Sequence, residues 1–271
     1  MTEDRENAAA EEAARTLREA LACPRAVGLA ECASTNLWAR QNPARLAPFG
    51  AVYTTNQTAG RGRLGRAWVN AAGQGLYYTV LLDLPLAQPE TLPQLSSLLV
   101  GQAIGQQYGA ACRIKWPNDL LLGGKKLVGI LCESMEYAGR RVWISGIGIN
   151  LAQPQRYFDA ANLPHGTSLA LAGYDADPAR DAAALAARLT ALFAAAVPDF
   201  AAQGFAPCRG AYREACVNLG RTVHYPLPGG GTAEGTAEDI DGDGRLVVRT
   251  AAGETAVFTG EVSVSGIYGQ V

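Results

Sequence analysis

Three arginines alternate with glycines in a stretch that contains no acidic residue, Gly60-Arg-Gly-Arg-Leu-Gly-Arg66. Because glycine lacks a Cβ atom, a ligand can approach the backbone N–H groups of such a loop closely. Arginine guanidinium groups are permanently charged, planar donors that match phosphate and carboxylate groups. A loop of this composition cannot bury enough apolar surface to fold alone, so we expect it to order around a small anion. A solvated surface loop and an arginine–glycine nucleic-acid tether have the same composition, and both alternatives stay open at this point.

Further motifs place polar groups or bare backbone beside expected strands. Ser34-Thr-Asn36 stands at a strand-to-helix corner, where Ser34 either caps the helix or offers its hydroxyl to a polar ligand. Lys115-Trp-Pro-Asn-Asp119 precedes a Gly-Gly hairpin signal, and Gly124-Lys-Lys-Leu-Val-Gly129 begins in it. In Gly146-Ile-Gly-Ile-Asn150 two glycines interrupt an apolar strand, as glycines often do where a ligand approaches the backbone. Taken alone, each motif also has an ordinary explanation as a turn, a cap or a packing accommodation.

The periodicity of apolar residues predicts the elements that carry these motifs. Helices are expected over residues 8–21, 92–104, 178–200 and 204–216. Strands are expected over residues 27–30, 50–55, 76–82, 112–122, 125–133 and 141–151. After residue 217, short strands separated by glycine turns indicate a small barrel. The chain is therefore expected to form three units: a helical tail over residues 1–26, a main domain over 27–217 and the barrel over 218–271.

Two further patterns are similar to metal-binding motifs, but we expect no metal site at either. Asp239-Ile-Asp-Gly-Asp-Gly244 matches the start of a calcium-binding EF-hand loop, but Thr250 stands where the bidentate glutamate is needed, so we expect a hairpin turn. Six cysteines, at positions 23, 32, 112, 132, 208 and 216, include no Cys-x-x-Cys pair. They are expected to be reduced structural thiols of a cytoplasmic protein.

The overall composition limits the classes of function. The 271 residues carry a net charge of −2 and have a pI near 5.8, which argues against general nucleic-acid binding because that affinity comes mostly from neutralised phosphates. There is no run of about 18 apolar residues, and the polar N-terminus is unlike a secretory signal, so no membrane association is expected. The positive charge of the arginine loop is therefore a local feature of a nearly neutral protein.

Taken together and in this order, the motifs resemble those of the biotin protein ligase family, from about residue 27 to the C-terminus. The resemblance implies an α+β fold, with a mixed, mostly antiparallel sheet covered by helices (the class II synthetase-like biotin–lipoate ligase fold) and an SH3-like C-terminal barrel. It also implies a two-step reaction. Biotin and ATP give biotinyl-5′-AMP, and the biotinyl group then passes to a lysine of a biotin carboxyl carrier protein. Such chemistry needs cations beside glycine-rich backbone, and the sequence contains them. It needs no nucleophile from the protein.

Each residue role below is implied by the resemblance. The biotin site comprises Ser34, Thr35, Asn36, Gln57, Gly60, Arg61, Gly62, Arg63, Lys126, Gly129, Gly146 and Gly148, with the three strand glycines under the biotin rings. The ATP site comprises Arg61, Arg63, Arg66, Trp68, Lys115, Asn118, Asp119, Lys126 and Asn150. Lys126, Arg63 and Arg66 are the catalytic cations, and Asp119 serves Mg²⁺ through the nucleotide. Lys125 should point to the opposite face of the strand from Lys126, so only one of the two can enter the site.

Two departures and two alternatives accompany this interpretation. Residues 1–26 cannot form the winged helix-turn-helix of repressor relatives, so we expect ligase activity without DNA binding. Leu64 stands where many relatives have a basic residue, so we expect the ordering of the arginine loop to differ from theirs. The alternatives are a lipoate–protein ligase with the same adenylation chemistry and a non-enzymatic nucleic-acid-binding protein. A homodimer is compatible with the resemblance, since relatives can dimerise through the sheet.

Overall fold

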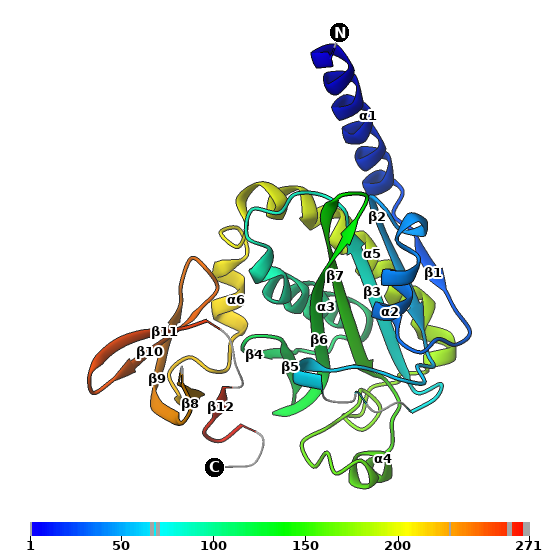
Figure 1. Ribbon diagram of the computed structural model, residues 1–271. Helices are drawn as coiled ribbons and strands as arrows, with labels where there is room; N and C mark the ends of the chain where they lie inside the picture. Colours follow the sequence, from blue (N-terminus) through cyan, green and yellow to red (C-terminus); the bar gives the residue numbers. More distant parts are fainter. Residues whose placement is uncertain (1, 66–67, 69–70, 228, 259–261, 268–271) are drawn as a thin grey trace.

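The computed structural model describes residues 2–65, 68, 71–227, 229–258 and 262–267 (Figure 1). Its largest element is a seven-stranded sheet of order β1-β2-β3-β7-β6-β5-β4. The strands are β1 (Ala26–Gly28), β2 (Phe49–Thr54), β3 (Gly75–Leu82), β4 (Arg113–Lys115), β5 (Asp119–Leu122), β6 (Lys125–Tyr137) and β7 (Arg140–Asn150). β1 runs parallel to β2 and the other neighbouring pairs are antiparallel, which confirms the mixed, mostly antiparallel sheet.

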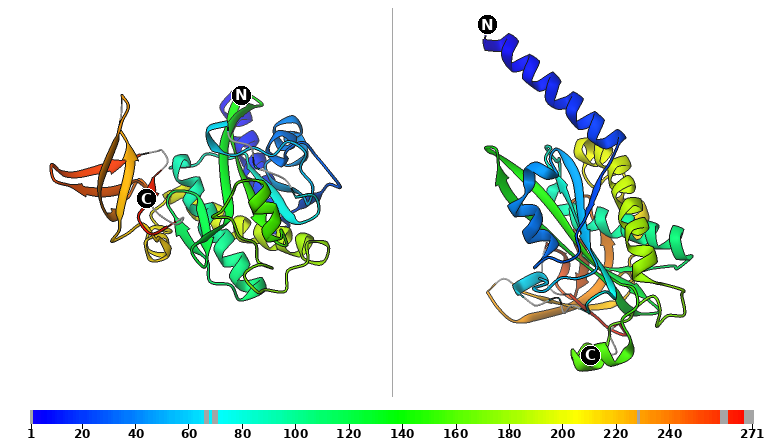
Figure 2. Two further views of the ribbon diagram at one scale, coloured as in Figure 1. Left: turned by 90° about the horizontal axis from the view of Figure 1, so that it is seen from below. Right: turned by 90° about the vertical axis from the view of Figure 1, so that its right-hand side faces the viewer.

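Helices cover both faces of this sheet (Figure 2). α3 (Leu92–Tyr108) and α5 (Pro178–Gln203) pack on one face, whereas the short α2 (Thr35–Gln41) packs on the other. Successive side chains of a strand point to opposite faces. On β7, Ile147 and Ile149 therefore join the core beneath α3 and α5, and Val142 and Ile144 join a smaller core beneath α2.

α5 is the one helix among the described residues that is long and apolar enough to cross a bilayer, judged by length and composition alone. In the structure it is a core helix. Leu185, Leu189, Phe193, Val197 and Phe200 are each at most 1% exposed, and all of them belong to the cluster that covers the sheet. Its apolar character is therefore explained by packing within the protein.

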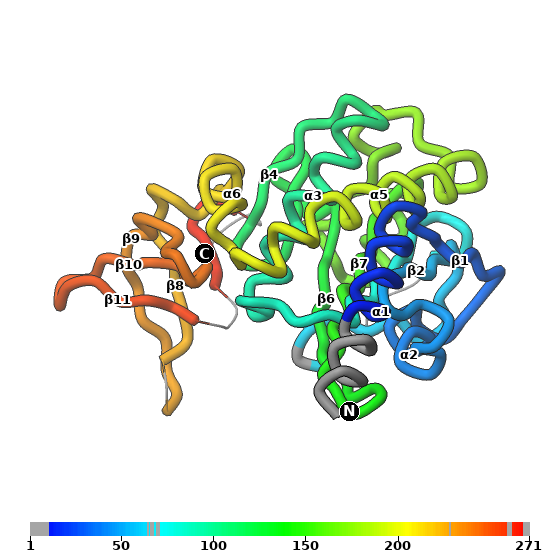
Figure 3. The backbone as a smooth tube through the Cα atoms, turned by 90° about the horizontal axis from the view of Figure 1, so that it is seen from above, coloured from blue at the N-terminus to red at the C-terminus, as the bar shows by residue number. Residues whose placement is uncertain are grey.

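Several predicted elements have different bounds in the structure. The N-terminal helix α1 is longer than predicted (Thr2–Ala22), and it projects from the rest of the molecule (Figures 1 and 3). The run over residues 112–122 is divided into β4 and β5 by a turn at Trp116–Pro117, whereas the hairpin at Gly123–Gly124 is as predicted. The remaining helices are α4 (Gln155–Ala160), α6 (Arg209–Ala215) and the 3₁₀ turns η1 (Pro43–Arg45), η2 (Arg63–Gly65) and η3 (Pro89–Thr91).

A second, five-stranded antiparallel sheet follows α6 and lies beside the seven-stranded sheet (Figure 1). Its strands are β8 (Thr222–Pro226), β9 (Thr232–Ile240), β10 (Leu246–Thr250), β11 (Gly253–Val257) and β12 (Ser263–Val264), in the order β11-β10-β9-β8-β12. Its core also includes Trp116 and Tyr212 from the preceding part of the chain. Because β11 and β12 form the two edges, the hydrogen bonds among the described strands do not close a barrel, and the SH3-like barrel stays a prediction.

Candidate active site

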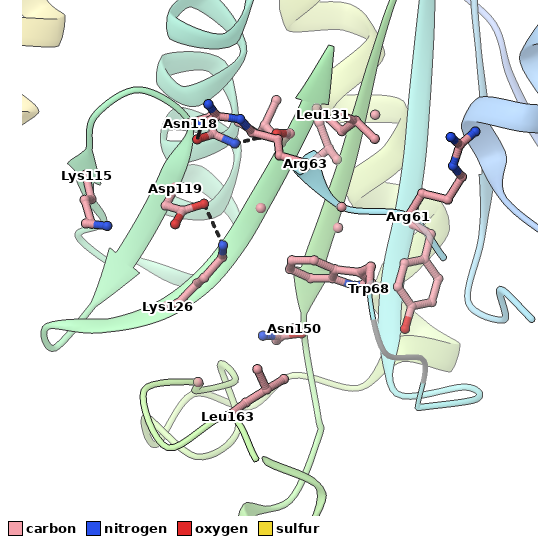
Figure 4. A pocket seen from close by; sticks show the side chains of 18 of the residues that line it. Arg61, Arg63, Trp68, Lys115, Asn118, Asp119, Lys126, Leu131, Asn150 and Leu163 are labelled. Atoms are coloured by element: carbon pink, nitrogen blue, oxygen red, sulfur yellow. Dashed lines mark hydrogen bonds and ion pairs between the residues drawn. The ribbon is translucent and has the colours of Figure 1, made fainter. Parts of the chain in front are cut away.

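A cavity of about 480 Å³ lies over the face of the large sheet that carries α2. Its walls come from the start of α2, the arginine loop, the ends of β5 and β6, the middle of β7 and residues 157–166 (Figure 4). Segments far apart in the sequence therefore meet here. The cavity brings together most of the predicted site residues that the structure describes, as the following paragraphs set out.

The floor of the cavity is set by the register of three antiparallel strands. In one row Thr79 of β3 lies opposite Gly146 of β7, which lies opposite Leu131 of β6. In the next row on the same face, Tyr77 lies opposite Gly148, which lies opposite Gly129. Both rows thus place glycine on the cavity face, and this leaves a groove of bare backbone between larger side chains.

Asn36 fills the first row. A Cβ atom at Gly146 would lie 2.0 Å from Oδ1 of Asn36, so only glycine fits beneath this amide. The Asn36 Nδ2 atom donates to the Leu131 carbonyl oxygen at 3.2 Å and to Oε2 of Glu133 at 2.8 Å. The Oδ1 atom accepts from the Thr79 hydroxyl at 2.7 Å. Gly146 therefore accommodates a protein side chain in this structure, whereas the sequence analysis placed the biotin rings on it.

Trp68 fills the second row. A Cβ atom at Gly129 would lie 2.4 Å from Cζ3 of Trp68, and one at Gly148 would lie 2.8 Å from its Cε2. The indole ring thus lies directly on the strand backbone, between the Asn36 row and Lys126, whose Nζ atom is 5.7 Å from the ring centroid. The family resemblance implied a place near adenine for Trp68 and a place under biotin for these glycines. The structure brings the indole and both glycines into contact.

Hydroxyl and amide groups of Ser34, Thr35 and Gln57 continue the wall beside Asn36. The backbone N–H of Thr35 donates to Oε1 of Gln57 at 2.7 Å, and its hydroxyl donates to the same oxygen at 3.1 Å. Both contacts orient the Gln57 amide with its oxygen toward α2. Ser34 stands at the N-cap position of α2, as predicted, but its side chain makes no capping hydrogen bond. Its buried hydroxyl instead belongs to the cavity wall.

Lys126 lies at the other end of the cavity and forms an ion pair with Asp119, Nζ to Oδ1, at 2.7 Å (Figure 4). The Lys126 backbone also makes two hydrogen bonds to residues 165–167. Its N–H donates to the His165 carbonyl, and its carbonyl accepts from the Thr167 N–H. The neighbouring Lys125 is exposed and is not among the described lining residues, as strand alternation requires. One lysine of the pair therefore enters the cavity.

The arginine loop is attached to the Lys115–Asp119 segment through Arg63. Its Nη1 atom donates to Oδ1 of Asn118 at 2.7 Å, and Nδ2 of Asn118 donates to the Ile130 carbonyl at 2.6 Å (Figure 4). Arg61 is exposed and, with Gly62 and Lys115, contributes to the cavity wall, while Gly60 approaches the carbonyl of Trp68. Arg66, predicted to be a catalytic cation, lies outside the described residues.

Asn150, the last predicted site residue, uses both ends of its side chain within the protein. Its Nδ2 atom donates to the Thr167 carbonyl and its Oδ1 atom accepts from Nε2 of Gln153, each at 3.0 Å. Asn150 thus anchors the segment that follows the cavity wall of residues 157–166. The sequence did not predict that wall, because Tyr157, Leu163 and His165 follow no helical or strand period. It did not predict Tyr77 as a lining residue either. Burial raises the pKa of the Tyr77 hydroxyl well above its usual value.

The C-terminal part of the chain also contributes to the cavity, because Val262 and Ser263 are among its lining residues, and it contacts the Lys115–Asp119 segment. The Trp116 backbone N–H donates to Oδ1 of Asn218 at 2.8 Å, and the Trp116 indole N–H donates to the Gly244 carbonyl at 2.9 Å. The Tyr212 hydroxyl donates to the Pro117 carbonyl at 3.1 Å. The turn that resembled a calcium loop is a β9–β10 hairpin turn, as predicted, but it also contacts the segment that carries Lys115 and Asp119.

Comparisons with known proteins agree with this fold and site. Residues 30–150 match the biotin/lipoate A/B protein ligase family, and residues 219–265 match the biotin protein ligase C-terminal domain. A biotin–[acetyl-CoA-carboxylase] ligase of Paracoccus denitrificans is 35% identical over 251 residues, which cover 88% of this chain and 100% of that protein. Among solved structures, the biotin protein ligase of Aquifex aeolicus in complex with biotin and ATP has a TM-score of 0.71 at 24% identity, covering 89% of this chain and 98% of that one. That of Leishmania major in complex with biotinyl-5-AMP has a TM-score of 0.59 at 26% identity, covering 89% and 98%.

The fold and the cavity thus define a ligase of the biotin and lipoate class. On the strength of the Paracoccus relative and of the two family matches, the chain belongs to the biotin protein ligase family.

Proposed function

We propose that this chain is an ATP-dependent biotin–protein ligase that forms biotinyl-5′-AMP and then transfers the biotinyl group to a lysine of a biotin carboxyl carrier protein. The observation that carries the proposal is the order of groups along β6. Asn36 lies over the row of Leu131, Trp68 lies over Gly129, and Lys126 lies near the start of the strand. A molecule with a polar ring at one end and a carboxylate at the other matches that order.

The first step joins two anions, so the protein has to position them and reduce their repulsion. A biotin carboxylate oxygen attacks the α-phosphate of ATP, a P–O bond forms, and pyrophosphate leaves. Lys126 is proposed to donate to the oxygens on which negative charge increases in this step. Arg63 and Arg61 are proposed to hold the carboxylate and the α-phosphate close together, with Arg66 as a further contact to the triphosphate. Lys115 and Asn118 are proposed to hold the nucleotide, and Trp68 to lie between its adenine and biotin.

Mg²⁺ is proposed to accompany the nucleotide, and the donors present fit that role. Mg²⁺ is commonly held by one or two carboxylates together with substrate phosphates and water. Asp119 supplies one half-buried carboxylate at the cavity, and no cluster of three His, Cys, Asp or Glu side chains occurs among the described residues. When bound there, the ion would neutralise phosphate charge.

In the second step a lysine amine of the acceptor attacks the carbonyl of the adenylate, an amide forms, and AMP leaves. Binding of the acceptor domain would also exclude water, which otherwise hydrolyses the adenylate. We propose a carboxyl carrier subunit of acetyl-CoA carboxylase as the acceptor, in keeping with the name of the Paracoccus relative.

The test is to incubate the purified chain with ATP, Mg²⁺, biotin and a carrier domain, and to measure the carrier by mass spectrometry. We expect the mass of one added biotinyl group, and biotin-dependent release of pyrophosphate in the absence of the carrier. Faster pyrophosphate release with lipoate than with biotin would identify a lipoate–protein ligase instead. Release with neither acid would refute the proposed function.

Four further properties are proposed with the function. Residues 1–26 do not bind an operator, because residues 2–22 form a single helix. The three units over residues 1–26, 27–217 and 218–271 are domains, the last of them an SH3-like barrel. The protein is cytoplasmic, in line with its six free cysteines. It forms a homodimer through the sheet, and light scattering with and without biotin and ATP would measure the mass.

A further inference from the structure

Glu133 contacts the biotin-binding wall of the cavity without lining it. It lies two residues after Leu131 on β6, hence on the same face of the sheet, and it is half-buried. Its Oε2 atom accepts a hydrogen bond from Nδ2 of Asn36 at 2.8 Å. Glu133 is not among the described residues that line the cavity, whereas Asn36 is. Any influence of Glu133 on a bound ligand therefore passes through Asn36.

The chemistry of this contact fixes which way the Asn36 amide faces. A carboxylate offers only acceptors, whereas the two ends of an amide differ, one donating and one accepting. Glu133 therefore requires the Nδ2 end on its side, and the Leu131 carbonyl at 3.2 Å makes the same requirement. The Oδ1 end must then face Thr79, whose hydroxyl can donate to it at 2.7 Å. The two acceptors, Glu133 and the Leu131 carbonyl, thus select a single orientation of the amide, and the Thr79 hydroxyl, which can donate or accept, is compatible with it.

That orientation matters to a ligand with a cyclic urea. Such a ring carries two N–H donors on either side of one carbonyl acceptor, and an amide oxygen has two lone pairs, so Oδ1 of Asn36 can accept a ligand N–H besides the Thr79 hydroxyl. With the amide reversed, its NH₂ group would meet the ligand's own N–H donors. A wall that must recognise ureido N–H groups therefore depends on how Asn36 is turned.

We propose that Glu133 is a positioning and specificity residue for biotin, whose carboxylate holds the Asn36 amide with its oxygen available to a ureido N–H. The inference rests on the proposed function and assigns a role to a residue outside the cavity lining. Glu133 touches no reacting atom. It acts by making one of two nearly isosteric orientations of Asn36 the stable one, so it discriminates among ligands by their ring donors.

The test uses Glu133→Gln, which keeps the shape of the side chain but adds an amide that can pair with Asn36 in either orientation. We expect the Kd of biotin, measured by calorimetry, to rise about tenfold to a hundredfold, the range for a lost hydrogen bond to a charged group. The KM of ATP and the kcat at saturating biotin should stay within about twofold of wild type, since a tenfold change needs a full lost contact. The matched control is Glu136→Gln on the same strand, whose exposed side chain pairs only loosely with Arg141 at 3.6 Å. It should leave the biotin Kd unchanged.

Biotin analogues distinguish a positioning role of Glu133 from a merely structural one. Two biotin analogues, in each of which a ring oxygen replaces one ureido N–H, cannot donate at the changed position. Wild type should bind at least one of them about tenfold more weakly than biotin, and Glu133→Gln should lose most of that difference, as expected for coupled groups. Glu133→Asp retains the carboxylate and should retain the discrimination, even if its biotin affinity is lower.

Three results would overturn the inference. One is a biotin Kd of Glu133→Gln equal to that of wild type. Another is an equal loss of affinity for biotin and for both analogues, which would mean that Glu133 has a merely structural role. The third is loss of discrimination in Glu133→Asp, which covers the case in which Glu133→Gln does not fold. All three presuppose that wild type binds biotin and releases pyrophosphate; if it does neither, the proposed function fails and this inference fails with it.

Discussion

One glycine in the contact between the C-terminal sheet and the preceding part of the chain can be tested directly. Gly244 has φ +73°, in the left-handed region, where alanine costs about 1–2 kcal/mol. A Cβ atom there would also lie 2.9 Å from Cγ2 of Thr91 and 3.0 Å from Nε2 of Gln94. Both side chains are buried, at 0% and 4% exposure, so neither has room to retreat. Gly244→Ala should therefore push the turn away from the catalytic domain.

The magnitude follows from what that movement breaks. The Gly244 carbonyl accepts from the Trp116 indole at 2.9 Å and from Nε2 of Gln94 at 3.1 Å, and both bonds are buried. Leaving a buried donor unsatisfied costs about 1–3 kcal/mol. Counting the backbone term and the loss of one of these two bonds, Gly244→Ala should lower the free energy of unfolding by about 2–5 kcal/mol. That is a large part of the 5–15 kcal/mol typical of a native protein.

The assay is urea denaturation combined with steady-state kinetics of pyrophosphate release. Because Trp116 adjoins Lys115 and the Asn118–Asp119 pair, we expect the KM of ATP to rise in Gly244→Ala. The Kd of biotin, whose proposed ring contacts lie at the far end of the cavity, should stay close to wild type. Gly242→Ala is the matched control, since it lies in the same turn and a Cβ atom there meets nothing within 4 Å. If the two variants unfold at the same urea concentration, the Gly244 contact does not hold the two parts together.

Three other variants test the site itself. Gly146→Ala should displace Asn36 by about 1 Å and weaken biotin binding about tenfold or more in calorimetry, whereas unchanged affinity would show that the row tolerates a methyl group. Lys126→Ala should slow adenylate formation about a hundredfold to a thousandfold in single-turnover experiments, and an undiminished rate would remove Lys126 from the mechanism. Arg63→Ala should weaken biotin binding in the presence of a nucleotide analogue and leave the loop from Gln57 onward open to protease; cleavage protected by ligand as in wild type would contradict this.

Local patterns in the sequence predicted most of the elements, because these depend on short-range periodicity, whereas the meeting of the motifs in one site was implied by the family resemblance. Lys126 and Lys125 illustrate this: strand alternation predicted that only one of the two enters the cavity, while the choice of Lys126 came from the resemblance. A turn at Trp116–Pro117 was one of the explanations left open for its motif, although residues 112–122 were expected to form one strand. Pro117 has no N–H to donate to a strand ladder, and the tertiary partners of Trp116, Asn218 and Gly244, hold the turn.

The role of the strand glycines shows what local patterns cannot supply. Gly129, Gly146 and Gly148 correctly marked a close approach to bare backbone, but the sequence does not say what approaches. The answer depends on register: Gly148 lies opposite Gly129, and two residues away on the same two strands Gly146 lies opposite Leu131. That pairing divides one groove into two adjacent positions, one taken by Asn36 and the next by Trp68.

This division has a consequence for how the protein recognises its ligand. If the glycines made room for biotin alone, alanine at each of them would weaken biotin binding in the same way. Because Gly146 accommodates Asn36 while Gly129 and Gly148 accommodate Trp68, the effects should differ in kind. Gly146→Ala should impair the recognition of ureido donors, whereas Gly148→Ala should move the indole and so affect biotin and nucleotide together. The bare backbone is thus best understood as seating for the two side chains that shape the ligand site.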